Sequence, residues 1–312
     1  MPAARRSEPT AFVLAGGGSL GAVQAGMLHA LHGGGIVPDF LVGSSVGALN
    51  AAHFAGRPDA AGIRALEQIW LGLRRADVFP FSLWGGFLRF LTKRSYIVRP
   101  DALRAVIDQA LSFDDLGDAR IPCHVTATDL LEGTAVVLSR GPASEALMAS
   151  AAVPAIFPPV QISGRLLIDG GVASNTPIAT AVRLGARRII VLPTGFSCAL
   201  DRPPRGTIEM ALHALNLLVM RQLVDDTERY ADRARIAVVP PICPLAISAY
   251  DFSRTAELIQ RAKTSTKRWL ADGGLDKAAG ALPHNEHPDR LTAVCPRKAM
   301  ANAALPQDEV AV

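Results

Sequence analysis

Ser45 is the central residue of a Gly-x-Ser-x-Gly pattern that runs from Gly43 to Gly47. A short apolar stretch precedes the pattern, and a helix-forming stretch of small residues follows it. On a strand–turn–helix elbow of this kind, the serine hydroxyl projects at a helix N-terminus, where backbone amides and the helix dipole favour a developing negative charge. The flanking glycines allow a sharp turn without a Cβ clash. Because the pattern is common by chance, it indicates a nucleophile only in combination with other features.

A second turn, Gly16-Gly17-Gly18-Ser19-Leu20-Gly21, also lies between an apolar strand-like stretch and a helical one. Its four glycines could aim several backbone N–H groups at one point, as an oxyanion or phosphate site requires. The same spacing matches the dinucleotide-binding fingerprint, which needs an acidic residue after the second strand. Asp39 precedes that strand, so the dinucleotide interpretation fails here. A purely structural glycine turn remains an alternative to the oxyanion site.

Acyl transfer by a serine also needs a base, and Asp169 is the best placed candidate. It follows the strand-like stretch 165–168 and precedes Gly170 and Gly171, so its carboxylate is expected at a strand end, where α/β sites form. An aspartate is a weak base at its reference pKa of about 3.9, so burial must raise that pKa. The downstream histidines stand in no comparable motif and are interpreted as structural or surface residues: His53, His124, His213, His284 and His287.

The three motifs occur in the order GGGSLG, GSSVG and DGG. Together with VLAGGGSLGAVQAGML, LVGSSVGALNAA and SAAVPAIFPPVQISGRLLIDGGVASNTPI, they make the chain resemble the patatin-like phospholipase family from about Ala11 to Arg188. The resemblance implies a Ser–Asp dyad without histidine, an oxyanion site from the glycine loop and hydrolysis of lipid acyl esters. It therefore implies Ser45 as nucleophile, Asp169 as general base, and the amides of Gly17 and Gly18 as the main oxyanion donors.

The chain departs from the family pattern at Leu20, where many members carry Arg or Lys. A preference for phospholipid headgroups is therefore left open. Thioesterase or transacylase activity would use the same residues. A catalytically idle lipid-binding or scaffold protein with the same fold is a further alternative.

The elements that must position these residues alternate in the manner of a parallel α/β sheet. Strands are predicted at 10–15, 40–43, 122–128, 135–138, 165–168, 188–192 and 235–239. Helices are predicted at 22–32, 46–56, 101–111, 143–152, 207–232 and 254–270. With the resemblance, this order predicts a three-layer α/β/α patatin-like fold with a mostly parallel central sheet. We expect residues 11–190 to form the catalytic core, 191–275 the C-terminal part of the same domain, and 1–9 and 280–312 disordered tails.

One segment, 77–99, interrupts the alternation and concentrates aromatic residues in a chain that has only 5% of them: Phe79, Phe81, Trp84, Phe87 and Phe90. Aromatic residues in an irregular insertion are most often part of a core. With Arg89, Lys93 and Arg94 alongside, the segment could instead form a lid that faces a lipid surface. Both interpretations are open.

The composition limits the classes of partner. Of 312 residues, 49% are apolar and 19% are charged, so a large core is feasible and general disorder is not expected. The net charge of +4 is spread in small groups, and no long basic block indicates nucleic acid. The predicted partner is a lipid acyl ester, with association to a membrane surface left open. No transmembrane segment, cofactor or metal site is expected, and a cytoplasmic location follows by default. The oligomeric state is not predicted.

Overall fold

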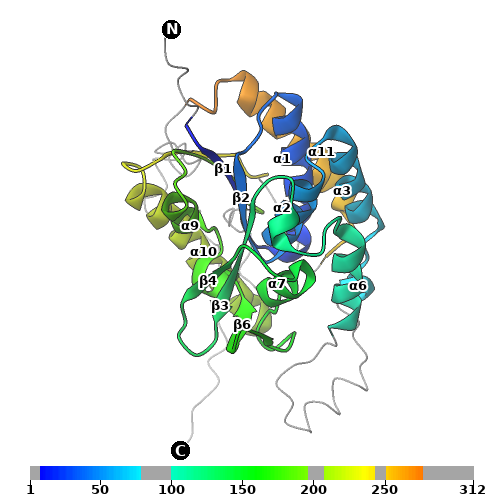
Figure 1. The fold of residues 1–312 in the computed structure, drawn as a ribbon. Coiled ribbons are helices and arrows are strands. Elements are labelled where there is room, and N and C mark those ends of the chain that lie inside the picture. Colours follow the sequence, from blue (N-terminus) through cyan, green and yellow to red (C-terminus); the bar gives the residue numbers. More distant parts are fainter. Residues whose placement is uncertain (1–7, 79–99, 196–206, 243–250, 277–312) are drawn as a thin grey trace, which may run out of the picture. The chain divides into compact units, whose positions relative to one another are not determined.

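The computed structural model describes residues 8–78, 100–195, 207–242 and 251–276 (Figure 1). The aromatic positions 79–99 and the predicted tail 280–312 lie outside these ranges, as do residues 1–7. All described residues belong to one compact unit within Met1–Gly280.

The strands in chain order are β1 (Thr10–Leu14), β2 (Phe40–Ser44), β3 (Cys123–Asp129), β4 (Ala135–Leu138), β5 (Val160–Ile162), β6 (Arg165–Asp169), β7 (Arg188–Leu192) and β8 (Arg235–Val238). The α-helices are α1 (Ala22–Gly33), α2 (Val46–Gly56), α3 (Ala60–Gly72), α4 (Arg75–Val78), α6 (Asp101–Ala110), α7 (Ala143–Ser150), α8 (Gly171–Ser174), α9 (Ile178–Arg183), α10 (Thr207–Arg229) and α11 (Thr255–Ala271). Two short 3₁₀ helices, η1 (Gly18–Gly21) and η2 (Leu116–Asp118), complete the described elements.

Within the described residues, eight strands form one sheet. The parallel part runs in the order β3, β2, β1, β7, β8. Its central strands are almost wholly apolar, for example RIIVL in β7, because parallel strands are buried on both faces. Strands β4 and β6 pair antiparallel with β3, and β5 pairs antiparallel with β6.

Strands β2 and β6 pair with the same edge of β3, and this pairing brings Ser45 and Asp169 together. Strand β4 occupies one edge of β3 along 125–128, so β2, which pairs with 123–126, must occupy the other edge. Strand β6 pairs with 127–129 and therefore continues along the same edge as β2. Ser44 lies opposite Thr126 and Asp169 lies opposite Ala127. The carboxyl ends of two strands that run in opposite directions thus meet end to end.

Helices cover both faces of the sheet. Phe12 and Leu14 of β1 belong to the main core, which also contains residues of α1, α2, α3, α7 and α11. Ala11 and Val13 are equally buried and point to the opposite face, because side chains alternate along a strand. On that face α9 contacts β1 and β7, and α10 contacts α9. Figure 1 shows α1, α3 and α11 on one side of the strands and α9 and α10 on the other. The expected three-layer fold with a mostly parallel sheet is confirmed.

Candidate active site

Ser45 lies on a strained turn between β2 and α2. Its backbone has φ 52° and ψ −127°, a conformation that costs a non-glycine residue of order 1–3 kcal/mol. The flanking glycines permit this turn because there is no room for side chains beside it. A Cβ at Gly43 would lie 2.5 Å from the Cα of Ala48, and one at Gly47 would collide with the carbonyl oxygen of Leu14. The sequence motif is therefore explained by close backbone approach.

The side chains of Ser45 and Asp169 are hydrogen-bonded across the junction of β2 and β6. The Ser45 Oγ–H donates to Asp169 Oδ2 at 2.7 Å, and the Gly171 N–H donates to Oδ1, also at 2.7 Å. Asp169 is only 7% exposed. Burial raises the pKa of its carboxyl to about 6, although the hydrogen bonds from Ser45 and Gly171 lower that pKa. The carboxylate is therefore a stronger base than an ordinary aspartate.

The backbone around Asp169 is held from two elements. Its N–H donates to the carbonyl oxygen of Ala152 at 2.9 Å, and its carbonyl oxygen accepts from Thr128 Oγ1 at 2.8 Å. A Cβ at the following residue, Gly170, would collide with the carbonyl oxygen of Thr126. The turn after β6 is therefore packed directly against β3, which fixes the direction of the carboxylate.

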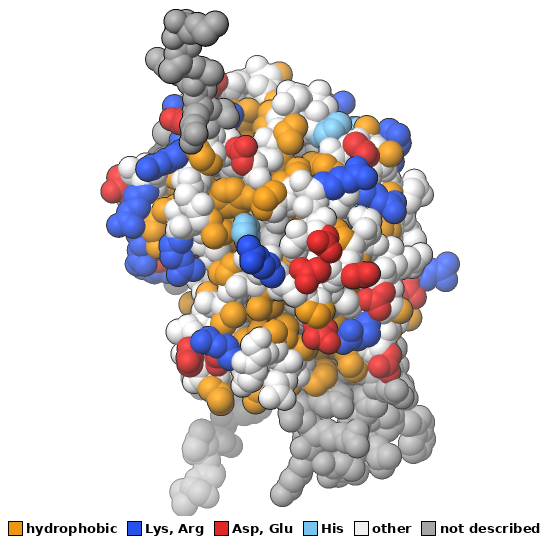
Figure 2. All heavy atoms as spheres, in the orientation of Figure 1, with side chains coloured by type: hydrophobic (Ala, Val, Ile, Leu, Met, Phe, Trp, Pro, Cys, Tyr) orange, Lys and Arg blue, Asp and Glu red, His pale blue; other side chains and the backbone are white. Residues whose placement is uncertain are grey.

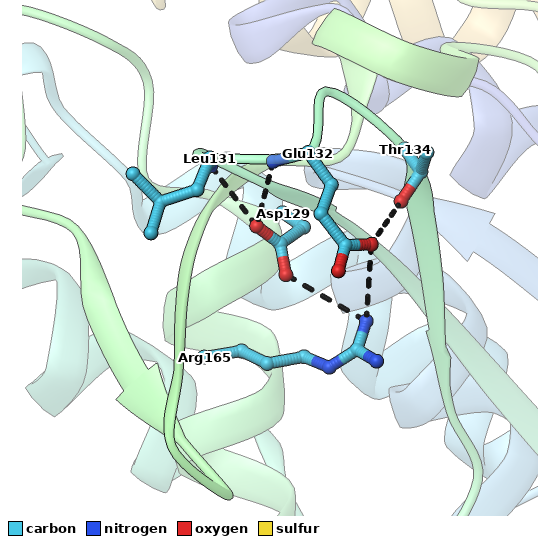
Figure 3. A network of polar contacts seen from close by, with 5 residues as sticks. All are labelled: Asp129, Leu131, Glu132, Thr134 and Arg165. Carbon is cyan, nitrogen blue, oxygen red and sulfur yellow. Dashed lines mark hydrogen bonds and ion pairs between the residues drawn. The ribbon is translucent and has the colours of Figure 1, made fainter.

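A second polar network braces the far end of this strand pair (Figure 3). Asp129, the last residue of β3, is buried and accepts backbone N–H bonds from Leu131 at 2.9 Å and Glu132 at 3.1 Å. Arg165, the first residue of β6, lies 3.6 Å from the Asp129 carboxylate and 3.8 Å from that of Glu132. The β3–β4 turn and the start of β6 are thereby tied together. This arrangement supports the register that places Asp169 beside Ser45.

The glycine loop packs against Ser45. A Cβ at Gly16 would lie 3.2 Å from the Cβ of Ser45. The Gly16 N–H donates to the carbonyl oxygen of Asn175 at 3.1 Å, so this amide is already engaged. In the described part of the chain, the N–H groups of Gly17 and Gly18 have no hydrogen-bond partner. These two amides are therefore free to donate hydrogen bonds to a negatively charged oxygen.

A buried polar network fixes both ends of the loop, and sequence reasoning did not find it. Gln24 Nε2 donates to the carbonyl oxygen of Ala15 at 2.8 Å. Asn50 Nδ2 donates to the carbonyl oxygen of Gly21 at 2.9 Å and to Gln24 Oε1 at 2.8 Å. The indole N–H of Trp70 completes the chain by donating to Asn50 Oδ1 at 2.9 Å. A satisfied network of this kind rigidifies its surroundings. A Cβ at Gly21 would lie 2.5 Å from Val46 Cγ2 and 2.9 Å from Trp70 Cζ2, so Gly21 is a packing position at the end of the loop.

The described histidines make no contact with the Ser45–Asp169 pair. His53 is buried, with Nδ1 2.8 Å from the carbonyl oxygen of Ala110 and Nε2 2.9 Å from that of Gly62. His124 Nδ1 lies 2.7 Å from Ser139 Oγ, and burial lowers the pKa of its imidazole. His213 lies on α10, but its side chain is outside the described set, as are His284 and His287. No histidine among the described side chains is placed to act as the base.

Two further expectations concern metals and membranes. Among the described residues, there is no group of three or more His, Cys, Asp or Glu side chains that could hold a metal ion. No described helix has the length and apolar character needed to cross a bilayer. Leu20, at the position where the sequence departs from the expected pattern, is half-buried and packs against the main core.

Comparison with known proteins decides the family. The profile of the family described as Patatin-like phospholipase matches residues 12–182, which is more than half of the chain and includes all three motifs. The chain belongs to the patatin-like phospholipase family. The match begins within β1 and ends within α9, so it covers Ser45, Asp169 and the glycine loop.

Related proteins align with this patatin-like chain over different fractions of their own length. It is 33% identical over 209 residues to an uncharacterised NTE family protein of Mycobacterium bovis, covering 65% of this chain and 54% of that protein. It is 28% identical over 199 residues to lysophospholipase NTE1 of Scheffersomyces stipitis, covering 64% of this chain and 12% of that protein. The chain thus spans about half, or less, of the length of these relatives.

Two solved structures resemble the chain at lower sequence identity than these relatives. The human GIVD cytosolic phospholipase A2 in complex with methyl γ-linolenyl fluorophosphonate has a TM-score of 0.47 and 13% identity, over 86% of this chain and 58% of that chain. VipD from Legionella pneumophila has a TM-score of 0.47 and 15% identity, over 85% of this chain and 67% of that chain.

Proposed function

We propose that this chain is a serine lipid acyl hydrolase that uses Ser45 as nucleophile and Asp169 as general base. The observation that carries the proposal is the 2.7 Å hydrogen bond from Ser45 Oγ to a buried carboxylate whose pKa is about 6. Membership of the patatin-like phospholipase family supports a lipid ester as substrate. The relatives named lysophospholipase support the same class of substrate. We therefore propose phospholipase A or carboxylesterase activity on lipid esters.

In the acylation step, Ser45 Oγ attacks the ester carbonyl carbon and its proton passes to Asp169. The carbonyl oxygen becomes an oxyanion, which the free amides of Gly17 and Gly18 are proposed to stabilise; one such donor is typically worth about 3 kcal/mol. Collapse of this intermediate breaks the ester C–O bond, and Asp169 returns the proton to the leaving alkoxide. The product is an acyl-serine and a free alcohol.

In the deacylation step, water attacks the acyl-serine while Asp169 accepts a proton from that water. The second tetrahedral intermediate then releases the fatty acid, and the proton on Asp169 returns to Ser45 Oγ. A pKa of about 6 suits both halves of this cycle, because the group must accept a proton and give it back near neutral pH.

A catalytically idle protein with the same fold is the main alternative. The strained backbone of Ser45 and the buried carboxylate of Asp169 both reduce stability, and a purely structural role requires neither. This combination favours the enzyme.

The test is hydrolysis of a panel of p-nitrophenyl esters of graded acyl length, lysophosphatidylcholine and phosphatidylcholine by the wild type, Ser45→Ala and Ser44→Ala. Ser44 is a matched control because it is buried at the end of β2, next to Ser45, and its hydroxyl has no hydrogen-bond partner within the described part of the chain. We expect hydrolysis by the wild type and Ser44→Ala, and none by Ser45→Ala. Equal turnover in all three proteins, or no turnover of any ester by the wild type, would overturn the proposal.

A further inference from the structure

Ser150 contacts the backbone of both Ser45 and the turn after Asp169. It is the last residue of α7 and is fully buried, with no exposed surface. Its hydroxyl oxygen accepts the Ser45 N–H at 2.8 Å, and its own O–H donates to the carbonyl oxygen of Thr126 at 2.6 Å. Its backbone carbonyl oxygen accepts the N–H of Gly170 at 3.1 Å. One residue therefore joins β3, the nucleophile and the base turn.

The hydroxyl meets a specific need of the elbow. Ser45 precedes α2, so its N–H lies outside the hydrogen bonds of that helix. A buried N–H without a partner is costly, and the conformation at φ 52° persists only when its surroundings hold it in place. The Ser150 hydroxyl satisfies this N–H and anchors it to β3 at Thr126, the residue opposite Ser44 in the sheet. The Ser150 side chain thus helps to hold the strained turn at Ser45 in place.

We infer that Ser150 is a positioning residue that sets the Ser45 hydroxyl against the Asp169 carboxylate. The inference rests on the proposed function of the Ser45–Asp169 pair. Ser150 holds the nucleophile through its hydroxyl and the base turn through its backbone carbonyl, so a side-chain substitution releases only the nucleophile. The residue has no described contact with the side-chain oxygens that react, and its role is confined to geometry.

Replacement by alanine leaves the Ser45 N–H and the Thr126 carbonyl oxygen without their shared partner. The elbow is then free to relax, and the Oγ–Oδ2 hydrogen bond lengthens. A displacement of about 1 Å in a catalytic group can lower turnover about 100-fold, so we expect kcat to fall roughly 10- to 100-fold. The Michaelis constant should stay within about twofold, because no contact with substrate is removed.

The experiment compares Ser150→Ala with Ser44→Ala. Neither serine has exposed surface. Among the described residues, the Ser44 hydroxyl has no hydrogen-bond partner, whereas the Ser150 hydroxyl has two. Active sites are titrated with a fluorophosphonate, and kcat is expressed per titrated site, which removes any loss of folded protein. Ser150→Ala should show the reduced kcat, and Ser44→Ala should match the wild type.

The acid limb of the pH profile gives a second readout that a purely structural role would not move. The hydrogen bond from Ser45 lowers the pKa of Asp169, so its loss in Ser150→Ala should shift the limb to higher pH. If Ser150→Ala does not fold, Ser150→Cys keeps the shape with a weaker hydrogen-bonding group and should show a smaller shift and a smaller loss.

Three outcomes separate the two proposals. A reduced kcat per site and a shifted limb in Ser150→Ala or Ser150→Cys support the positioning role. Wild-type values of both quantities, together with an inactive Ser45→Ala, would overturn the role of Ser150 alone. Activity that survives in Ser45→Ala would instead overturn the proposed function on which the role rests.

Discussion

Replacement of Asp169 by asparagine is predicted to remove the proposed base and, at the same time, to stabilise the fold at neutral pH. The carboxylate is charged at neutral pH but only 7% exposed, and burial is the main cause of its raised pKa. The folded chain therefore binds this proton more tightly than the unfolded chain. An amide of nearly the same shape carries no charge, so the variant avoids the cost of burying one.

The magnitude follows from the shift of the Asp169 pKa from 3.8 to about 6. At 1.36 kcal/mol per unit, this shift corresponds to about 3 kcal/mol. Well below pH 3.8 the carboxyl is protonated in both states and contributes no penalty. As the pH rises, the unfolded chain loses its proton first and the wild type loses stability. The penalty levels off about one pH unit above the folded-state pKa of about 6. About half of the 3 kcal/mol develops between pH 5 and pH 8.

The assay is urea unfolding of the wild type and Asp169→Asn at pH 5 and pH 8. Effects of the amide on hydrogen bonding are nearly independent of pH and cancel when the two pH values are compared. The stability of the variant relative to the wild type should rise by about 1.4 kcal/mol between pH 5 and pH 8. A relative stability that stays constant, or falls, would show that the carboxyl is not held with a raised pKa and would refute this reasoning.

Three further predictions concern catalysis. The rate constant kcat/KM should rise with pH through an apparent pKa of about 6, since protonated Asp169 cannot accept the Ser45 proton; a pH–rate profile that is flat from pH 5 to pH 8 would contradict this. His53→Ala, His124→Ala and His213→Ala should each keep most of the turnover per folded molecule, although His53→Ala should lower the melting temperature because its ring contacts two backbone carbonyl groups. A large loss of kcat at a normal melting temperature in any of them would indicate a histidine base. Incubation with EDTA should leave activity unchanged, and loss that one metal restores would mean that the Ser–Asp mechanism is incomplete.

The site motifs could be predicted because each depends on local geometry. A serine between Gly43 and Gly47 requires a turn that side chains would obstruct, and Asp169 ends an apolar strand before two glycines. Sites in α/β proteins commonly lie at the carboxyl ends of strands, so the position of both residues after apolar strands is informative. Periodic apolar spacing also revealed most of the helices.

What the sequence does not show is the pairing between distant segments. The end-to-end meeting of β2 and β6 depends on which edge of β3 each strand joins, and no local pattern encodes that choice. The carbonyl oxygen of Asn175 engages the Gly16 amide from far along the chain, so the loop has fewer free amides than its four glycines suggest. The sequence patterns used above do not predict helix α3, although Asp59 is a typical helix N-cap residue. In the structure, the Asp59 carboxylate accepts the Gly62 N–H at the N-terminus of α3.

Ser150 illustrates the same difference at a single position. The sequence predicts a helix at 143–152 and so places Ser150 near a helix end, in the stretch SAAVP, but serines near helix ends are common. Only the three-dimensional contacts with Ser45, Thr126 and Gly170 distinguish it. The residues of the network Gln24, Asn50 and Trp70 are likewise ordinary in a helical sequence and become informative through their buried hydrogen bonds.

The most direct measurement is mass-spectrometric mapping of the protein after reaction with a lipid-like fluorophosphonate. The proposed mechanism predicts one modified residue, Ser45, with no label on the neighbouring Ser44. It also predicts that labelling disappears in Ser45→Ala and slows by orders of magnitude in Asp169→Asn, with loss of ester hydrolysis in parallel. If Ser45 stays unmodified by the probe while the folded protein still hydrolyses esters, the assignment of Ser45 and Asp169 as the catalytic pair is contradicted.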